Sequence, residues 1–134
     1  MGNEYALDAH TLIWFIGGNA RLGSNARAAL QDPGSRLYLP VIALAEACWA
    51  VARGKTSIPS LAALLAAVDA DSRTVVVPLD RAILDRSLTL SAIGEMHDRL
   101  IAAATLHLAG VSSIVPLLTC DPDIASSGLV TVVW

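Results

Sequence analysis

Five carboxylates stand where an α/β protein is expected to place its chemistry. Asp8 follows the apolar run EYAL, and Asp121 and Asp123 follow the apolar run PLLT; both runs are typical of short buried strands. Asp98 opens one apolar segment and Glu46 interrupts another. Acids gathered at one end of a parallel sheet would repel each other unless a cation neutralised them, and Mg²⁺ or Mn²⁺ prefers such oxygen ligands. These ions activate water and support phosphoryl displacement, so the acids point to chemistry on a phosphodiester.

Each of the four aspartates also has an ordinary structural interpretation. Asp8 could cap the helix that follows it. Asp121 and Asp123 flank Pro122 and could be plain turn residues. Asp98 lies near the start of a helix, where the helix dipole stabilises a negative charge. The functional interpretation therefore depends on the positions taken together.

Glu46 lies in the middle of LPVIALAEACWAVAR (39–53), an almost unbroken apolar helix. A buried charge without a partner is costly, so such a group is normally paired, metal-bound or neutralised. Ala43, Ala47 and Ala50 lie on the same side of the helix and leave room for another group to approach. The alternative is a solvated helix charge with Arg53 as a long-range partner.

Strand and helix patterns alternate along the chain, which predicts how these acids are positioned. Several predicted strands are continuously apolar, which is typical of a parallel sheet buried on both faces. The sequence therefore predicts one α/β domain over residues 1–134, a three-layer α/β/α sandwich with a central, mainly parallel sheet. The predicted strands are 4–7, 36–40, 74–77, 116–119 and 129–133; the predicted helices are 9–16, 24–31 with Ser24 as N-cap, 41–53, 61–70 capped by Ser60, 80–90 and 97–109; residues 120–128 are predicted as a loop.

Composition limits the classes of function. The 134 residues are 54% hydrophobic and 16% charged, and the net charge is −3. Such an apolar chain is expected to cover part of its surface with a partner. An acidic protein has no overall basic field for nucleic acid, so a polyanion would bind through local arginines or a metal. No apolar stretch is long enough for a membrane span and no signal peptide is present, which indicates a cytoplasmic protein.

Four segments, in this order, resemble one known family. They are YALDAHTLIWFI, LAEACWAVARGK, HDRLIAAATLHLAG and LLTCDPDIASSGLVTVVW, and together they cover residues 5–134. The chain is similar to PIN-domain ribonucleases of the VapC toxin type. The resemblance implies a small α/β/α sandwich and an Mg²⁺- or Mn²⁺-dependent endoribonuclease, the toxin of a type II toxin–antitoxin pair.

The resemblance also implies roles for individual residues. The four acids carried over by motif are Asp8, Glu46, Asp98 and Asp121. The three aspartates would be direct or water-mediated metal ligands, whereas Glu46 would hold the metal shell or orient the attacking water. Asp123 would be an auxiliary ligand or an outer-shell group. Thr119 would hydrogen-bond the nearby carboxylates and orient them.

The sequence departs from the family pattern in two places. Ala9 occupies the position directly after the first acid, where related sequences have Thr or Ser, and Thr11 is the hydroxyl nearby. Ala45 precedes the second acid, where Trp is common, and Trp49 follows one turn later. Neither change removes a metal ligand, so only the fine positioning of the site is affected.

Partners follow from the same resemblance. RNA is the implied substrate. Its candidate contacts are Arg53, Lys55 and Arg99, because they lie near active-site segments. The ordinary interpretation of these residues is that they are solvated surface charges. A VapB-like antitoxin and a homodimer are implied as well, with apolar helix faces in 24–31, 42–53 and 60–70 as interfaces. The alternative function is a catalytically silent PIN-fold binding or co-repressor module, which would have lost one or more acids.

Overall fold

The computed structural model describes residues 3–109 and 114–134. Parallel β-strands and α-helices alternate along most of this part of the chain. The strands are β1 (Glu4–Leu7), β2 (Arg36–Pro40), β3 (Thr74–Val77), β4 (Leu117–Leu118) and β5 (Val132–Val133). The helices are α1 (Ala9–Ile16), α2 (Ser24–Gln31), α3 (Val41–Ala52), α4 (Leu61–Ala70), α5 (Arg81–Ser87), α6 (Met96–Ala109) and α7 (Pro122–Ser127).

The five strands form one sheet in the order β3-β2-β1-β4-β5, and every pairing is parallel. The chain builds the sheet outward from β1 to β3 on one side and then returns to add β4 and β5 on the other. The order therefore reverses between β1 and β4. Crevices at such a reversal, outside the carboxyl ends of the strands, are where open α/β sheets bind their ligands.

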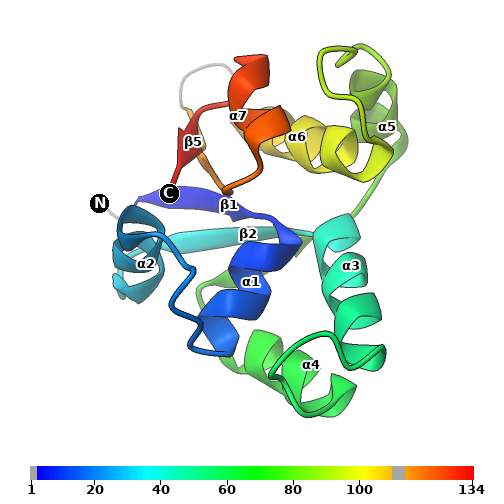
Figure 1. Ribbon diagram of the computed structural model, residues 1–134. Helices are drawn as coiled ribbons and strands as arrows, with labels where there is room; N and C mark the ends of the chain where they lie inside the picture. Colours follow the sequence, from blue (N-terminus) through cyan, green and yellow to red (C-terminus); the bar gives the residue numbers. More distant parts are fainter. Residues whose placement is uncertain (1–2, 110–113) are drawn as a thin grey trace.

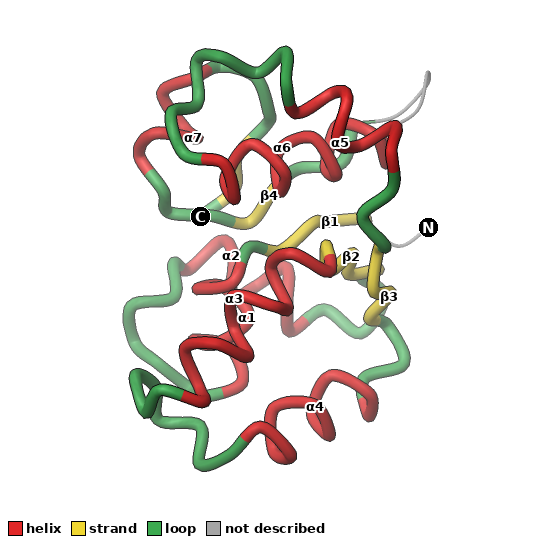
Figure 2. The backbone as a smooth tube through the Cα atoms, turned by 90° about the vertical axis from the view of Figure 1, so that its right-hand side faces the viewer, coloured by secondary structure: helices red, strands yellow, loops and turns green. Residues whose placement is uncertain are grey.

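Helices cover both faces of the sheet (Figures 1 and 2). One layer holds α1 to α4 and the other holds α5 to α7. The main core packs α1–α4 against the sheet, and a second core packs α5 and α6 against β3. The predicted three-layer α/β/α sandwich with a parallel central sheet is therefore confirmed. No helix among the described residues is long and apolar enough to cross a membrane.

Most element boundaries agree with the sequence-based prediction, and Ser60 caps α4 through a bond from the Ala63 backbone N–H. Several details were wrong. The last strand, β5, begins at Val132 rather than at 129. The N-cap of α2 is Gly23 rather than Ser24, which is already helical. The predicted helix over 80–90 ends at Ser87. The predicted loop over 120–128 contains α7, whose first turn the Asp121 side chain caps.

The C-terminal residue packs closely onto the start of α2. Gly23 lies so near that a Cβ atom there would stand 2.6 Å from the Trp134 carbonyl carbon. The Trp134 indole also meets the Trp14 ring, with 5.9 Å between ring centroids. The φ of Gly23 is −62°, so the close approach of Trp134, rather than the backbone conformation, requires glycine.

We therefore predict that Gly23→Ala lowers the free energy of unfolding by about 1–3 kcal/mol, the usual cost of overpacking. Urea denaturation would measure the loss. Gly94→Ala is the matched control, since nothing lies within 4 Å of a Cβ there, and it should leave stability nearly unchanged. Equal effects of the two substitutions would contradict the packing account.

Candidate active site

Asp8 is held rigidly at the carboxyl end of β1. Its side chain is buried and caps α1 by accepting the Thr11 backbone N–H at 2.9 Å. The Thr11 hydroxyl lies 2.7 Å from the same oxygen, Oδ1, and 2.6 Å from the Leu118 carbonyl of β4. The Thr119 hydroxyl donates to the other oxygen, Oδ2. Thr11 thus provides the hydroxyl that Ala9 lacks.

Thr119 links two of the acids. It is fully buried just beyond β4, where its hydroxyl donates to Asp8 and accepts the Asp121 backbone N–H at 3.1 Å. Asp121 in turn caps α7 by accepting the Asp123 backbone N–H at 2.8 Å. The Asp123 side chain is exposed in the first turn of that helix. The ends of β1 and β4 are therefore joined by one hydrogen-bonded chain.

Asp98 lies in direct contact with Asp121. It is half-buried in the first turn of α6, and the two side chains share a hydrogen bond. Burial, together with the charges of Asp121, Glu95 and Glu46, raises the pKa of Asp98 to about 7. A carboxyl with such a pKa keeps its proton at mildly acidic pH because a second negative charge is unfavourable there.

Glu95 and His97 shape the start of α6. One Glu95 oxygen accepts the Asp98 backbone N–H at 2.8 Å, and the other lies 2.6 Å from His97 Nδ1. This bond to Glu95 raises the pKa of the His97 imidazole. Sequence reasoning missed Glu95 because Glu is not among the residues preferred at a helix N-cap, so the sequence carries no signal there.

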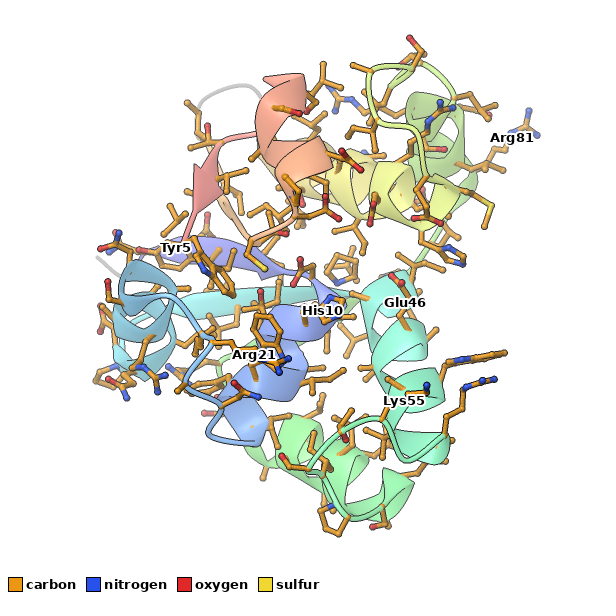
Figure 3. The ribbon with its side chains drawn as sticks, in the orientation of Figure 1. Tyr5, His10, Arg21, Glu46, Lys55 and Arg81 are labelled. Carbon is orange, nitrogen blue, oxygen red and sulfur yellow. The ribbon has the colours of Figure 1, made fainter. Side chains whose placement is uncertain are left out.

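Glu46 projects from α3 toward the start of α6 (Figure 3). Its side chain is half-buried, and burial raises the pKa of Glu46, with Glu95 and Asp8 raising it further and His97 opposing them. Arg53 does not pair with it; the Arg53 guanidinium stacks over the Trp49 ring at 5.0 Å. Glu46 is therefore electrostatically coupled to the other acids and is not a freely solvated helix charge.

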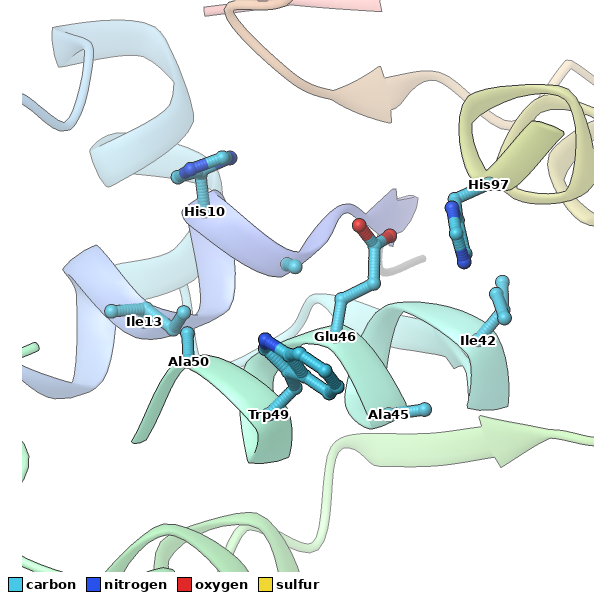
Figure 4. A pocket seen from close by; sticks show the side chains of 9 residues that line it. His10, Ile13, Ile42, Ala45, Glu46, Trp49, Ala50 and His97 are labelled. Carbon is cyan, nitrogen blue, oxygen red and sulfur yellow. The ribbon is translucent and has the colours of Figure 1, made fainter. Parts of the chain in front are cut away.

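An apolar pocket of about 530 Å³ opens between α1 and α3 beside these acids. Glu46 rises between the rings of His10 and His97, and Trp49 lies on the same helix as Glu46 (Figure 4). The remaining lining residues are Ala9, Ile13, Ile42, Ala45 and Ala50. The small side chains of α3 thus leave an open space next to Glu46.

The donor set has the chemistry of a hard-cation site. Within 3–109 and 114–134, no three His, Cys, Asp or Glu side chains already lie in positions that could jointly hold a metal ion. Asp98 and Asp121 instead share a hydrogen bond, which requires one of the two carboxyl groups to be protonated. Mg²⁺ needs only one or two direct carboxylates, with water completing its shell. This carboxylate pair fits such an ion.

The predicted RNA contacts lie in two places. Arg53 and Lys55 are exposed at the end of α3, where Gly54 has the positive φ of +67° typical of a helix C′ residue. Arg99 is partly buried, and its Nε donates to the Ile93 carbonyl. That bond gives Arg99 a structural role, so Arg53 and Lys55 are the better placed for a ligand.

Comparison with known proteins identifies the family. The PIN domain model matches residues 5–127. The chain belongs to the PIN domain family. The crystal structure of VapBC2 from Rickettsia felis, bound to a DNA fragment from their promoter, is similar in fold, with a TM-score of 0.70 and 15% identity over 97% of each chain. No curated protein sequence matches at a significant level.

In this PIN domain, we predict that Thr119→Val lowers the free energy of unfolding by about 1–3 kcal/mol, since it removes a donor from Asp8 and leaves the Asp121 N–H unpaired. Thr119→Ser retains the hydroxyl and should lose less. Chemical denaturation of both variants compares the two. A larger loss in Thr119→Ser than in Thr119→Val would show that the buried methyl group, rather than the hydroxyl, is what matters.

Stability of the metal-free PIN domain should also depend on pH. Because the pKa of Asp98 is raised in the folded state, the folded protein binds more protons, and its free energy of unfolding should fall as pH rises from about 4 to about 7. We expect a loss of about 1–2 kcal/mol after allowance for solvent screening. Asp98→Asn should flatten this dependence, whereas Asp69→Asn, an exposed acid in α4, should not. Denaturation in chelator at several pH values tests both.

Proposed function

We propose that this chain is a VapC-type toxin, a metal-dependent endoribonuclease that hydrolyses RNA phosphodiester bonds. The convergence of Asp8, Glu46, Asp98 and Asp121 where the strand order reverses is the observation that carries the proposal. Membership of the PIN family and the VapBC2-like fold support it. All four acids expected from the resemblance are present, which disfavours a catalytically silent binding module.

In this mechanism the protein positions the carboxylates before substrate arrives. Thr11 and Thr119 fix both oxygens of Asp8, so this acid cannot rotate away from the site. The capping bonds of Asp121 fix its carboxylate in the same way. Catalytic groups held by such supporting bonds need little reorganisation when the reaction begins.

Glu46 is the group best suited to orient the attacking water and accept its proton. Burial raises its pKa, and a raised pKa makes a carboxylate a stronger base near neutral pH. Asp8, Asp98 and Asp121 would hold Mg²⁺ or Mn²⁺, directly or through water. When bound, such an ion lowers the pKa of water and offsets charge on the phosphoryl oxygens. Cleavage in this manner leaves a 5′-phosphate and a 3′-hydroxyl.

We also propose an antitoxin partner and a homodimer. The structure exposes apolar side chains on α3 and α4, where the sequence predicted interfaces, and also around α5, where it did not. These residues are Val41, Leu61 and Leu65 on the first pair of helices, and Leu79, Leu84, Leu88 and Met96 on and around α5. Exposed apolar surface of this extent is typical of protein interfaces.

The decisive experiment is RNA cleavage by purified protein with Mg²⁺ or Mn²⁺. Asp98→Asn should lower the rate by on the order of a hundredfold or more, because one charge of the metal site is lost. Asp8→Asn should lower the rate similarly. It should also lower the free energy of unfolding, because the Asp8 carboxylate is buried and hydrogen-bonded at both oxygens. Chelator should abolish wild-type cleavage and added metal should restore it.

Asp69→Asn is the matched control, because it removes an exposed acid in α4, and it should cut RNA at the wild-type rate. Normal cleavage by both site variants in saturating metal would disprove the site assignment. A wild-type protein that neither binds metal nor cleaves RNA would favour the binding-module alternative.

A further inference from the structure

The pocket between α1 and α3 contains an aromatic side chain that the proposed reaction does not use. Trp49 lines this pocket beside Glu46 and is 63% exposed, although the Arg53 guanidinium lies 5.0 Å from its ring centroid. Burying a tryptophan is strongly favourable, so a ring left this open is well suited to contact a ligand. The stacked guanidinium covers one face of the ring and orients it.

Three functional groups follow one another along a single face of α3. Glu46, Trp49 and Arg53 are spaced three and four residues apart, which places them on neighbouring turns. The helical rise separates Trp49 from Glu46 by about 4.5 Å along the axis and Arg53 from Glu46 by about 10.5 Å. The order along the helix is therefore acid, indole, cation.

The opposite wall of the pocket comes from α1. His10 is exposed there, and its ring lies 5.5 Å from that of Trp14. Between the walls, Ile13 and Ala50 line an apolar interior, and the whole space measures about 530 Å³. A pocket with an aromatic ring on each wall and an apolar interior suits a flat heteroaromatic ring.

We propose that this pocket is a subsite for one unpaired nucleobase of the RNA, which stacks on the free face of Trp49 next to the bond that is cut. The inference rests on the proposed ribonuclease function and extends it to the neighbouring nucleotide. A phosphodiester at the acids places an adjoining base over the indole, and the next phosphate then meets Arg53.

Charge favours RNA over a protein segment as the occupant. Lys55 is exposed beyond Arg53 at the far end of α3, well separated from Glu46 (Figure 3). Two cations that follow the indole suit a chain that carries a phosphate at every repeat. An apolar peptide would gain from contact with Trp49 but would have no use for these cations.

The test is steady-state cleavage of a single-stranded RNA oligonucleotide with one mapped cleavage site. Trp49→Ala should raise KM about tenfold with a smaller change in kcat, because loss of a stacking platform weakens binding. Trp49→Phe keeps a stacking ring and should stay within a few-fold of wild type. Val76→Ala, an exposed apolar residue of β3 outside the site and outside the proposed interfaces, is the control and should not change KM.

A second series removes one base at a time from the same oligonucleotide. For the wild type, an abasic nucleotide at one position beside the cleaved bond should raise KM about as much as Trp49→Ala does. For the Trp49→Ala protein, the same abasic substrate should raise KM hardly any further. The reason is that the substitution and the missing base remove the same contact.

The outcomes separate the two proposals. If wild type cleaves RNA but neither Trp49→Ala nor any abasic position alters KM, the subsite is disproved while the ribonuclease stands. If Trp49→Ala instead weakens only the binding of a protein partner, the pocket belongs to that partner and the subsite is likewise disproved. If wild type binds this RNA without cutting it, the proposed ribonuclease function is disproved. The subsite is then supported if Trp49→Ala raises the dissociation constant for the RNA, and disproved if it does not. If it neither binds nor cuts RNA, both proposals fail.

Discussion

Two neighbouring parallel strands, β1 and β4, end side by side at the point where the strand order reverses, and the rest of the site depends on that constraint. The residues directly beyond them must share one small volume. The chain places Asp8 and Thr119 there, so a single buried hydroxyl bonds to the first acid and accepts the backbone N–H of Asp121. The register of β1 with β4 therefore sets the spacing of Asp8 and Asp121, independently of the helices that carry the other two acids. Helices α6 and α3 then bring Asp98 and Glu46 to a position that the strands have already defined.

Bringing these acids together costs electrostatic energy, and the structure shows how that cost is limited. Asp8 accepts hydrogen bonds from the Thr11 backbone N–H and the Thr119 hydroxyl, whereas burial and the neighbouring acids raise the pKa of Asp98 to about 7. A nearby imidazole, His97, opposes the rise in the pKa of Glu46. Asp98 and Glu46, whose pKa values are both raised, therefore hold a proton more readily than an isolated carboxyl group does. A divalent cation that replaced the proton between Asp98 and Asp121 would remove the repulsion that remains.

Much of the fold was predictable because its signals are local. Continuously apolar strands, helix stops and the cap at Ser60 all act within a few residues, and they located nearly every element. Helix α7 was missed because Asp121 and Pro122 suit a turn, although the same pair also suits a helix start, with Asp as the N-cap and Pro in the first turn. The identity of the acids followed from the motif resemblance. Their mutual contacts could not be predicted, since the bond from Thr119 to Asp8 joins residues 111 positions apart and depends on the register of β1 with β4.

The high apolar content of the chain has two separate explanations, a buried core and the proposed protein interfaces. The core explains most of it, because two buried clusters of apolar side chains hold the sandwich together. The exposed apolar residues on α3, α4 and α5 are not needed for that core. A domain held together mainly by apolar packing can keep a repulsive acid cluster that is unfavourable until a ligand binds. Any species that binds the folded site and not the unfolded chain then adds its binding free energy to stability, so metal, RNA and partner proteins should each stabilise this PIN domain.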